Sequence, residues 1–99
     1  MVILLAELER RWLRLFQQLQ DGLDVPPSQR LRTEGLMEAA VLLDPGSEER
    51  LQQAMDVAYR QVNQRGLAQD FGADWSSFFT FPQIPAMAQR APVYPSTTE

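Results

Sequence analysis

The side chains that most often carry out enzyme chemistry are missing from this sequence. It has no His and no Cys, and all nine basic residues are Arg. The absence of His removes the usual general base near neutral pH and the commonest metal ligand. The absence of Cys and Lys removes thiolate and Schiff-base nucleophiles. We therefore predict a protein that is not an enzyme and holds no metal or cofactor.

Carboxylates are the strongest remaining candidates for acid–base work. Glu34 and Glu38 are four residues apart, so both lie on one face if the segment is helical. A catalytic pair also needs an environment that separates the two pKa values, and a hard cation needs more oxygen ligands than two. Ser76 and Ser77 have no histidine to activate them. A carboxylate-based or metal-assisted enzyme using Glu34 and Glu38 is our alternative hypothesis, against the simpler interpretation of a solvated polar face.

One basic cluster, Arg10, Arg11 and Arg14, resembles an anion-binding face at first sight. Glu7 and Glu9 dilute its charge, and the whole chain has a net charge of −4. Binding to nucleic acid depends largely on neutralised phosphates. We predict no nucleic-acid partner and no membrane partner, and we interpret the cluster as a solvated face.

Three segments have helical patterns. Residues 2–20 show an apolar stripe at steps of three and four. After two prolines, Ser28 is positioned to cap a second helix that runs to about Leu43, with Thr33 as an alternative later cap. Ser47 is positioned to cap a third helix, and Gly66 to end it. The expected apolar faces are Leu5, Leu8, Trp12, Leu15 and Leu19 in the first helix; Leu36, Ala39, Ala40 and Leu43 in the second; and Leu51, Met55, Ala58 and Val62 in the third.

Short turns between these helices predict an all-α fold, a small bundle of three amphipathic helices. The aromatic and Pro-rich C-terminal segment is expected to pack back on the bundle. Asp74 is positioned to cap a short helix in it, and the alternative is an α+β fold with a short strand near 78–81. We predict a single helical domain over 1–81 and an extended, Pro-rich, partly disordered tail over 82–99.

The aromatic segment has two interpretations. Its large side chains either complete a core that three short helices leave marginal, or stay partly exposed and bind a partner. We expect Trp75 and one of Phe78 and Phe79 in the core, whereas the segment beyond Phe81 is equally suited to packing and to binding. The residues we predict at a partner-binding surface are Trp75, Phe79, Phe81, Ile84 and Tyr94.

The function predicted by these patterns is that of a small non-catalytic interaction or adaptor module, which binds a protein partner or forms a homodimer. We expect it in the cytoplasm. The opening MVILLA has no basic residues before it and meets Glu7 after six residues, unlike a signal peptide.

Overall fold

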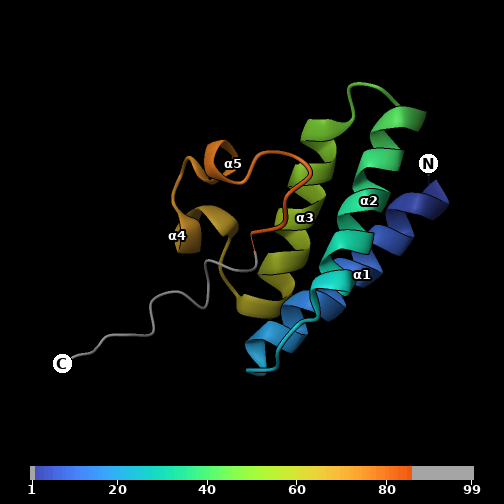
Figure 1. The fold of residues 1–99 in the computed structure, drawn as a ribbon. Helices are drawn as coiled ribbons and strands as arrows, with labels where there is room; N and C mark the ends of the chain where they lie inside the picture. Colours follow the sequence, from blue (N-terminus) through green and yellow to red (C-terminus); the bar gives the residue numbers. More distant parts are fainter. Residues whose placement is uncertain (1, 86–99) are drawn as a thin grey trace.

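The computed structural model describes residues 2–85, which form five helices and no strand (Figure 1). The all-α prediction is confirmed for this part of the chain, and the alternative strand near 78–81 is absent from it. The helices are α1 (Val2–Gln20), α2 (Pro27–Leu43), α3 (Glu48–Asn63), α4 (Leu67–Phe71) and α5 (Trp75–Phe78).

Helix α1 is the centre of the bundle. It packs along both α2 and α3, and its contact with α3 is the more extensive. The predicted stripe is buried in its middle, at Leu8, Trp12 and Leu15, with Phe16 beside them. Leu5 and Leu19, at the ends of the stripe, are only partly buried against this core. The periodicity of α1 thus predicts correctly which face is buried.

Helix α2 begins two residues earlier than an N-cap at Ser28 predicts. Its N-cap is Pro26, and Pro27 occupies the first turn, where a missing N–H costs nothing and a fixed φ favours the helix. Ser28 is therefore inside the helix and not its cap. The alternative start at Thr33 is also wrong, because the Thr33 hydroxyl donates to the carbonyl of Gln29 across one helical turn (3.0 Å).

Only Ala40 of the four residues predicted on the buried face of α2 is fully buried, and Ala39 is partly buried. Leu43 is exposed and Leu36 only partly buried. Apolar residues surround much of this helix, so its sequence does not single out one face. The buried residues of α2 are Thr33, Glu34, Met37 and Ala40, of which the first two are polar.

Helix α3 begins after Ser47, as predicted, with Glu48 and Glu49 in the first turn where the helix dipole favours negative charge. The Ser47 hydroxyl is buried but caps nothing, and it makes no hydrogen bond with the described residues. The helix ends earlier than Gly66 predicts. Gln64 adopts the left-handed conformation that ends α3 (φ 64°), and Gly66 instead precedes α4.

Beyond α3 the chain folds back over the bundle, as Figure 1 shows for the segment that leaves α5 and crosses α3. Asp74 does precede α5, but its side chain makes no capping hydrogen bond. The Phe81–Pro82 peptide bond is cis. Ile84 and Pro85 are both buried, so packing continues four residues past the predicted boundary at Phe81.

Candidate functional site

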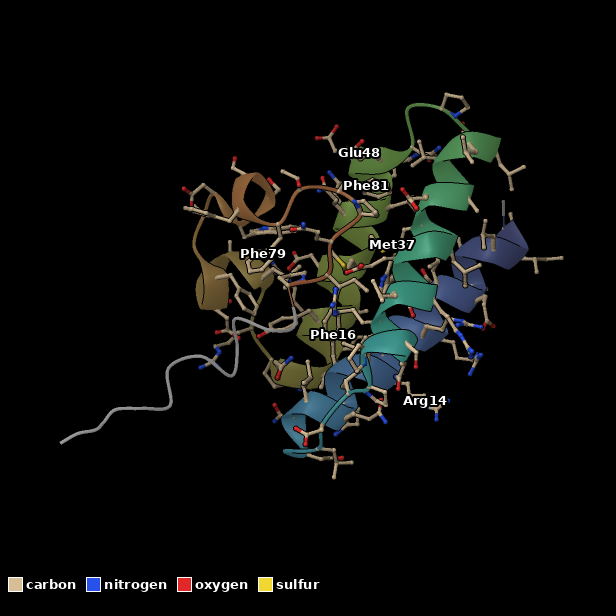
Figure 2. All side chains as sticks on the ribbon, in the orientation of Figure 1. Arg14, Phe16, Met37, Glu48, Phe79 and Phe81 are labelled. Atoms are coloured by element: carbon tan, nitrogen blue, oxygen red, sulfur yellow. The ribbon has the colours of Figure 1, made fainter. Side chains whose placement is uncertain are left out.

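Three of the predicted partner-binding residues pack within the domain. Ile84 is 2% exposed and belongs to the core, while Trp75 and Phe81 are partly buried against it. Figure 2 shows Phe79 and Phe81 on the segment that covers the bundle. Tyr94 lies outside the described residues. We expected Trp75 and one of Phe78 and Phe79 in the core, but Trp75 and Phe79 are only partly buried and Phe78 is exposed. A partner-binding role for this segment stays a prediction.

Glu34 anchors the segment to α2. Glu34 as a whole is 8% exposed, and Oε2 of its carboxylate accepts a hydrogen bond from the backbone N–H of Ile84 (2.9 Å) and another from Nη1 of Arg30 (3.0 Å). The bond to Ile84 joins residues fifty positions apart in the chain. Burying a carboxylate is costly unless it is paired and hydrogen-bonded. Glu34 has an ion pair with Arg30 and a hydrogen bond from Ile84.

Those same bonds bear on the carboxylate-enzyme hypothesis. Glu34 is committed to Arg30 and Ile84, whereas Glu38, one turn later, is exposed. The two carboxylates therefore lie in very different surroundings. Within residues 2–85, no group of three His, Cys, Asp or Glu side chains is arranged to hold a metal ion.

A chain of aromatic rings connects α1 to the C-terminal segment. Tyr59 packs edge-on against Phe16 and Phe71, with ring centroids 5.0 and 5.9 Å apart, and Phe71 packs in the same manner against Phe79 at 5.7 Å. The buried hydroxyl of Tyr59 donates a hydrogen bond to the Asp70 carboxylate. Burial, with help from this bond and the Asp70 charge, raises the pKa of Tyr59. These contacts fix α4 on α3.

Trp75 also borders a shallow depression of about 240 Å³ between α3 and α5. Two carboxylates, Glu49 and Asp56, stand on its α3 side. Both carboxylate oxygens of Asp56 already have partners: Oδ1 accepts a hydrogen bond from the backbone N–H of Leu67 (2.7 Å), and Oδ2 pairs with Nε of Arg60 (3.1 Å). The Asp56 carboxylate in this depression therefore serves the packing of α3 and α4.

One end of the bundle carries exposed aliphatic side chains. The short connection between α1 and α2 makes these helices antiparallel, so the start of α1 lies near the end of α2 (Figure 1). Four large side chains are exposed there: Val2 (83%), Ile3 (86%), Leu42 (82%) and Leu43 (70%). We call them the aliphatic end. Large apolar side chains gathered in this way are typical of interaction surfaces.

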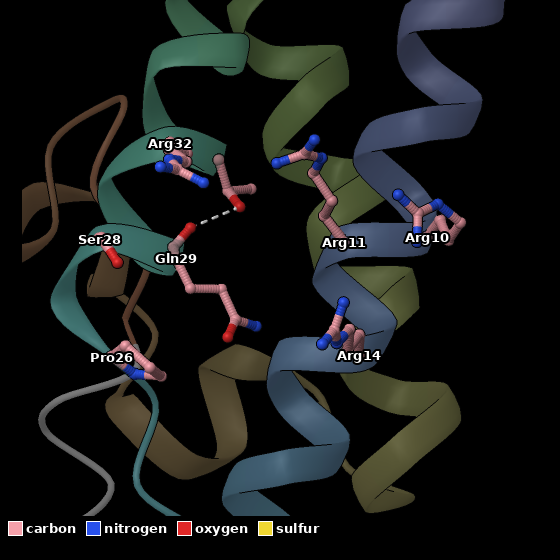
Figure 3. A pocket seen from close by; sticks show the side chains of 8 residues that line it. Arg10, Arg11, Arg14, Pro26, Ser28, Gln29 and Arg32 are labelled. Carbon is pink, nitrogen blue, oxygen red and sulfur yellow. Dashed lines mark hydrogen bonds between the residues drawn. The ribbon is translucent and has the colours of Figure 1, made fainter.

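A groove of about 360 Å³ lies between α1 and α2, and we call it the arginine groove. Figure 3 shows Arg10, Arg11 and Arg14 on α1 and Arg32 facing them from α2. The remaining lining residues, from the start of α2 and the turn before it, are Pro26, Ser28, Gln29 and Thr33. The basic cluster predicted as a solvated face is thus one wall of a concave surface.

Within this groove the four guanidinium groups differ in their partners. Glu7 accepts hydrogen bonds from Nε of both Arg10 (3.1 Å) and Arg11 (2.7 Å). These two hydrogen bonds, Arg10 first, lower the pKa of Glu7 to about 2. Arg14 and Arg32 form no side-chain hydrogen bond or ion pair with any described residue.

Neither surface is evident from the sequence. Arg32 is eighteen residues from Arg14, and only the antiparallel packing of α1 and α2 places both in one groove. The aliphatic end also departs from the sequence prediction, which places Leu43 on the buried face of the second helix, whereas Leu43 is 70% exposed.

Comparisons with protein-family models, with curated proteins and with solved structures find no match for this chain. No helix within residues 2–85 has the length and apolar character needed to cross a membrane.

Proposed function

We propose that this protein is a small non-catalytic interaction module that works in the cytoplasm and forms a homodimer through its aliphatic end. The observation that carries the proposal is the exposure of Val2, Ile3, Leu42 and Leu43 at one end of the bundle. Removing such side chains from water supplies the main driving force of most protein association.

A second copy of the chain suits this end better than an unrelated surface. Hydrophobic burial is not directional, so an aliphatic patch is complementary to itself. The residue after Leu43 is Asp44, which pairs with Arg50 at the exposed edge. A two-fold axis through the aliphatic end places the same residues on both sides. An edge with both signs of charge then allows Arg50 of one copy to face Asp44 of the other.

The proposal is tested by light scattering coupled to size exclusion over a range of protein concentrations. We expect the wild-type chain to shift from monomer to dimer as concentration rises. The double substitution Ile3→Glu and Leu42→Glu should weaken the dimer roughly a hundredfold or more, because it brings like charges into an apolar interface. Both positions are solvent-exposed in the monomer, so circular dichroism and urea unfolding should change little.

The matched control is Leu23→Glu, the same kind of change at an exposed leucine beyond the opposite end of α1. It should leave association unchanged. A wild-type chain that stays monomeric at the highest concentration contradicts the proposal, as does a dimer that tolerates the double substitution.

A further inference from the structure

We propose that the arginine groove binds a small anion bearing more than one phosphate charge, such as a pyrophosphate or a phosphoester. This surface lies along the α1–α2 seam and involves none of the residues of the aliphatic end. The inference therefore does not depend on the proposed dimer.

The shape of the groove favours a small ligand. Its volume of about 360 Å³ is in the range of small-molecule sites, which are roughly 300–1,000 Å³. Arginines approach it from two helices, so a ligand between them is contacted on both sides (Figure 3). A long nucleic acid is disfavoured, because the net charge of −4 repels a polymer that extends beyond the groove.

The charge of the groove is unbalanced within the described part of the chain. Four of the nine arginines line it, and Glu7 is the carboxylate paired with them. Arg14 and Arg32 remain without a side-chain partner. A single carboxylate would neutralise one of these charges, whereas an anion with two or more charges can pair with Arg14 and Arg32 together.

Phosphate chemistry fits the donors that are present. Guanidinium groups present paired N–H donors that match phosphate oxygens and can bind them bidentately. Helix α2 begins at the edge of the groove, and its dipole favours negative charge there. Its N–H groups contribute little, because Pro26 and Pro27 have none and the N–H groups of Gln29 and Arg30 bond to the carbonyl of Pro26. The arginines are therefore the evidence for the site.

The affinity of the groove is expected to be limited by Glu7. That carboxylate competes with any ligand for Arg10 and Arg11. Its pKa of about 2 means that it stays ionised at neutral pH. Replacing it with an uncharged residue should therefore strengthen anion binding, an effect opposite in sign to that of removing an arginine.

The experiment is isothermal titration of the full chain with inorganic pyrophosphate at low salt. We expect saturable binding that weakens as salt is added. Arg14→Gln and Arg32→Gln should each reduce the affinity roughly tenfold, the usual effect of losing a charge-assisted hydrogen bond. Both side chains are exposed and have no partner among the described residues, so circular dichroism should show an unchanged fold.

Three comparisons make the test decisive. Arg60→Gln removes the same charge from an exposed side chain of α3, outside the groove, and should leave binding unchanged. Glu7→Gln should raise the affinity severalfold, as loss of a competing carboxylate requires. Citrate, a polyanion of carboxylates, should bind more weakly than pyrophosphate; equal binding would overturn the assignment to phosphate.

A lipid headgroup offers the same phosphate chemistry as a free ligand. Phosphatidylcholine vesicles with and without phosphatidylinositol bisphosphate therefore form a second arm, read by co-sedimentation. Binding to pyrophosphate alone supports a free ligand, and binding to both or to the charged vesicles alone supports a headgroup. Binding to neither, or binding that Arg14→Gln and Arg32→Gln leave intact, overturns the proposal.

Discussion

At the scale of single residues, Tyr59 contributes to the structure in two ways. Its ring lies between Phe16 and Phe71, and its hydroxyl donates to Asp70. Asp70 also pairs with Nε of Arg65 (2.8 Å), so the carboxylate has a second partner that does not depend on Tyr59. One substitution can therefore measure the contribution of the hydroxyl to stability separately from that of the ring.

Tyr59→Phe keeps the ring contacts and removes the hydrogen bond. We expect it to lower the free energy of unfolding by roughly 1–3 kcal/mol, the range for a buried hydrogen bond to a charged group. Urea unfolding at neutral pH measures the change. Asp70→Asn, which keeps an acceptor for the hydroxyl but loses the charge, should also disturb the pair with Arg65. A Tyr59→Phe variant as stable as wild type would contradict this account.

The same residue makes stability depend on pH at the alkaline end. Because the pKa of Tyr59 is raised in the folded state, the unfolded chain loses this proton first, from about pH 10 upward. The unfolded state then binds fewer protons than the folded state, so stability falls as pH rises. Below about pH 10 the contribution is fully present. Tyr59→Phe should lack this part of the alkaline decline.

A Tyr94→Phe background makes Tyr59 the sole tyrosine, since the sequence contains two. Its phenolate absorbance should then appear together with unfolding, as judged by circular dichroism. Phenolate formation near pH 10 in a chain that stays folded would contradict a raised pKa.

At the scale of elements, the sequence predicts helices better than it predicts their faces. The stripe of α1 is strongly periodic, and its centre is buried as expected. Helix α2 is apolar on several sides, and a contact on its buried face joins Glu34 to Ile84, fifty residues away. No local pattern contains that contact. The position of α2, and with it the shape of the arginine groove, could not be predicted for this reason.

Glu34→Ala tests whether this contact orients the C-terminal segment. It leaves the buried N–H of Ile84 without an acceptor and the guanidinium of Arg30 without its carboxylate. We expect a loss of roughly 1–3 kcal/mol in the free energy of unfolding. Hydrogen exchange at the Ile84 amide should become faster, because its protection depends on this bond.

Glu38→Ala is the matched control, the same change one turn along α2 at an exposed position. It should alter stability by no more than about 0.5 kcal/mol. Equal effects of the two substitutions, or unchanged protection at Ile84, would show that Glu34 does not hold the segment.

At the scale of the whole molecule, the domain is completed by residues far from its helices in sequence. Composition bears only on chemistry that needs His, Cys or Lys, whereas periodicity correctly predicted the helical bundle. The boundary at Phe81 was drawn from proline content, which reports on local backbone and not on burial. Residues 82–85 contribute Ile84 to the core and a backbone donor to Glu34.

Two truncations measure what those residues contribute. A chain ending at Pro85 keeps every contact in the described part of the structure, whereas a chain ending at Phe81 loses the burial of Ile84 and its bond to Glu34. We expect the shorter chain to be less stable than the longer by roughly 2.5–5 kcal/mol, combining about 1.5–3 for the buried side chain with about 1–2 for the lost hydrogen bond to the Glu34 carboxylate.

The comparison also separates folding from association. If Ile84 acts through the core, the shorter chain should unfold at lower urea, and at temperatures where it remains folded its dimer should match that of the longer chain. Equal stability with a weaker dimer would instead assign residues 82–85 to a partner surface, as the sequence alone allowed. Size exclusion and urea unfolding on both truncations distinguish these outcomes, because the aliphatic end lies on α1 and α2 and is present in both chains.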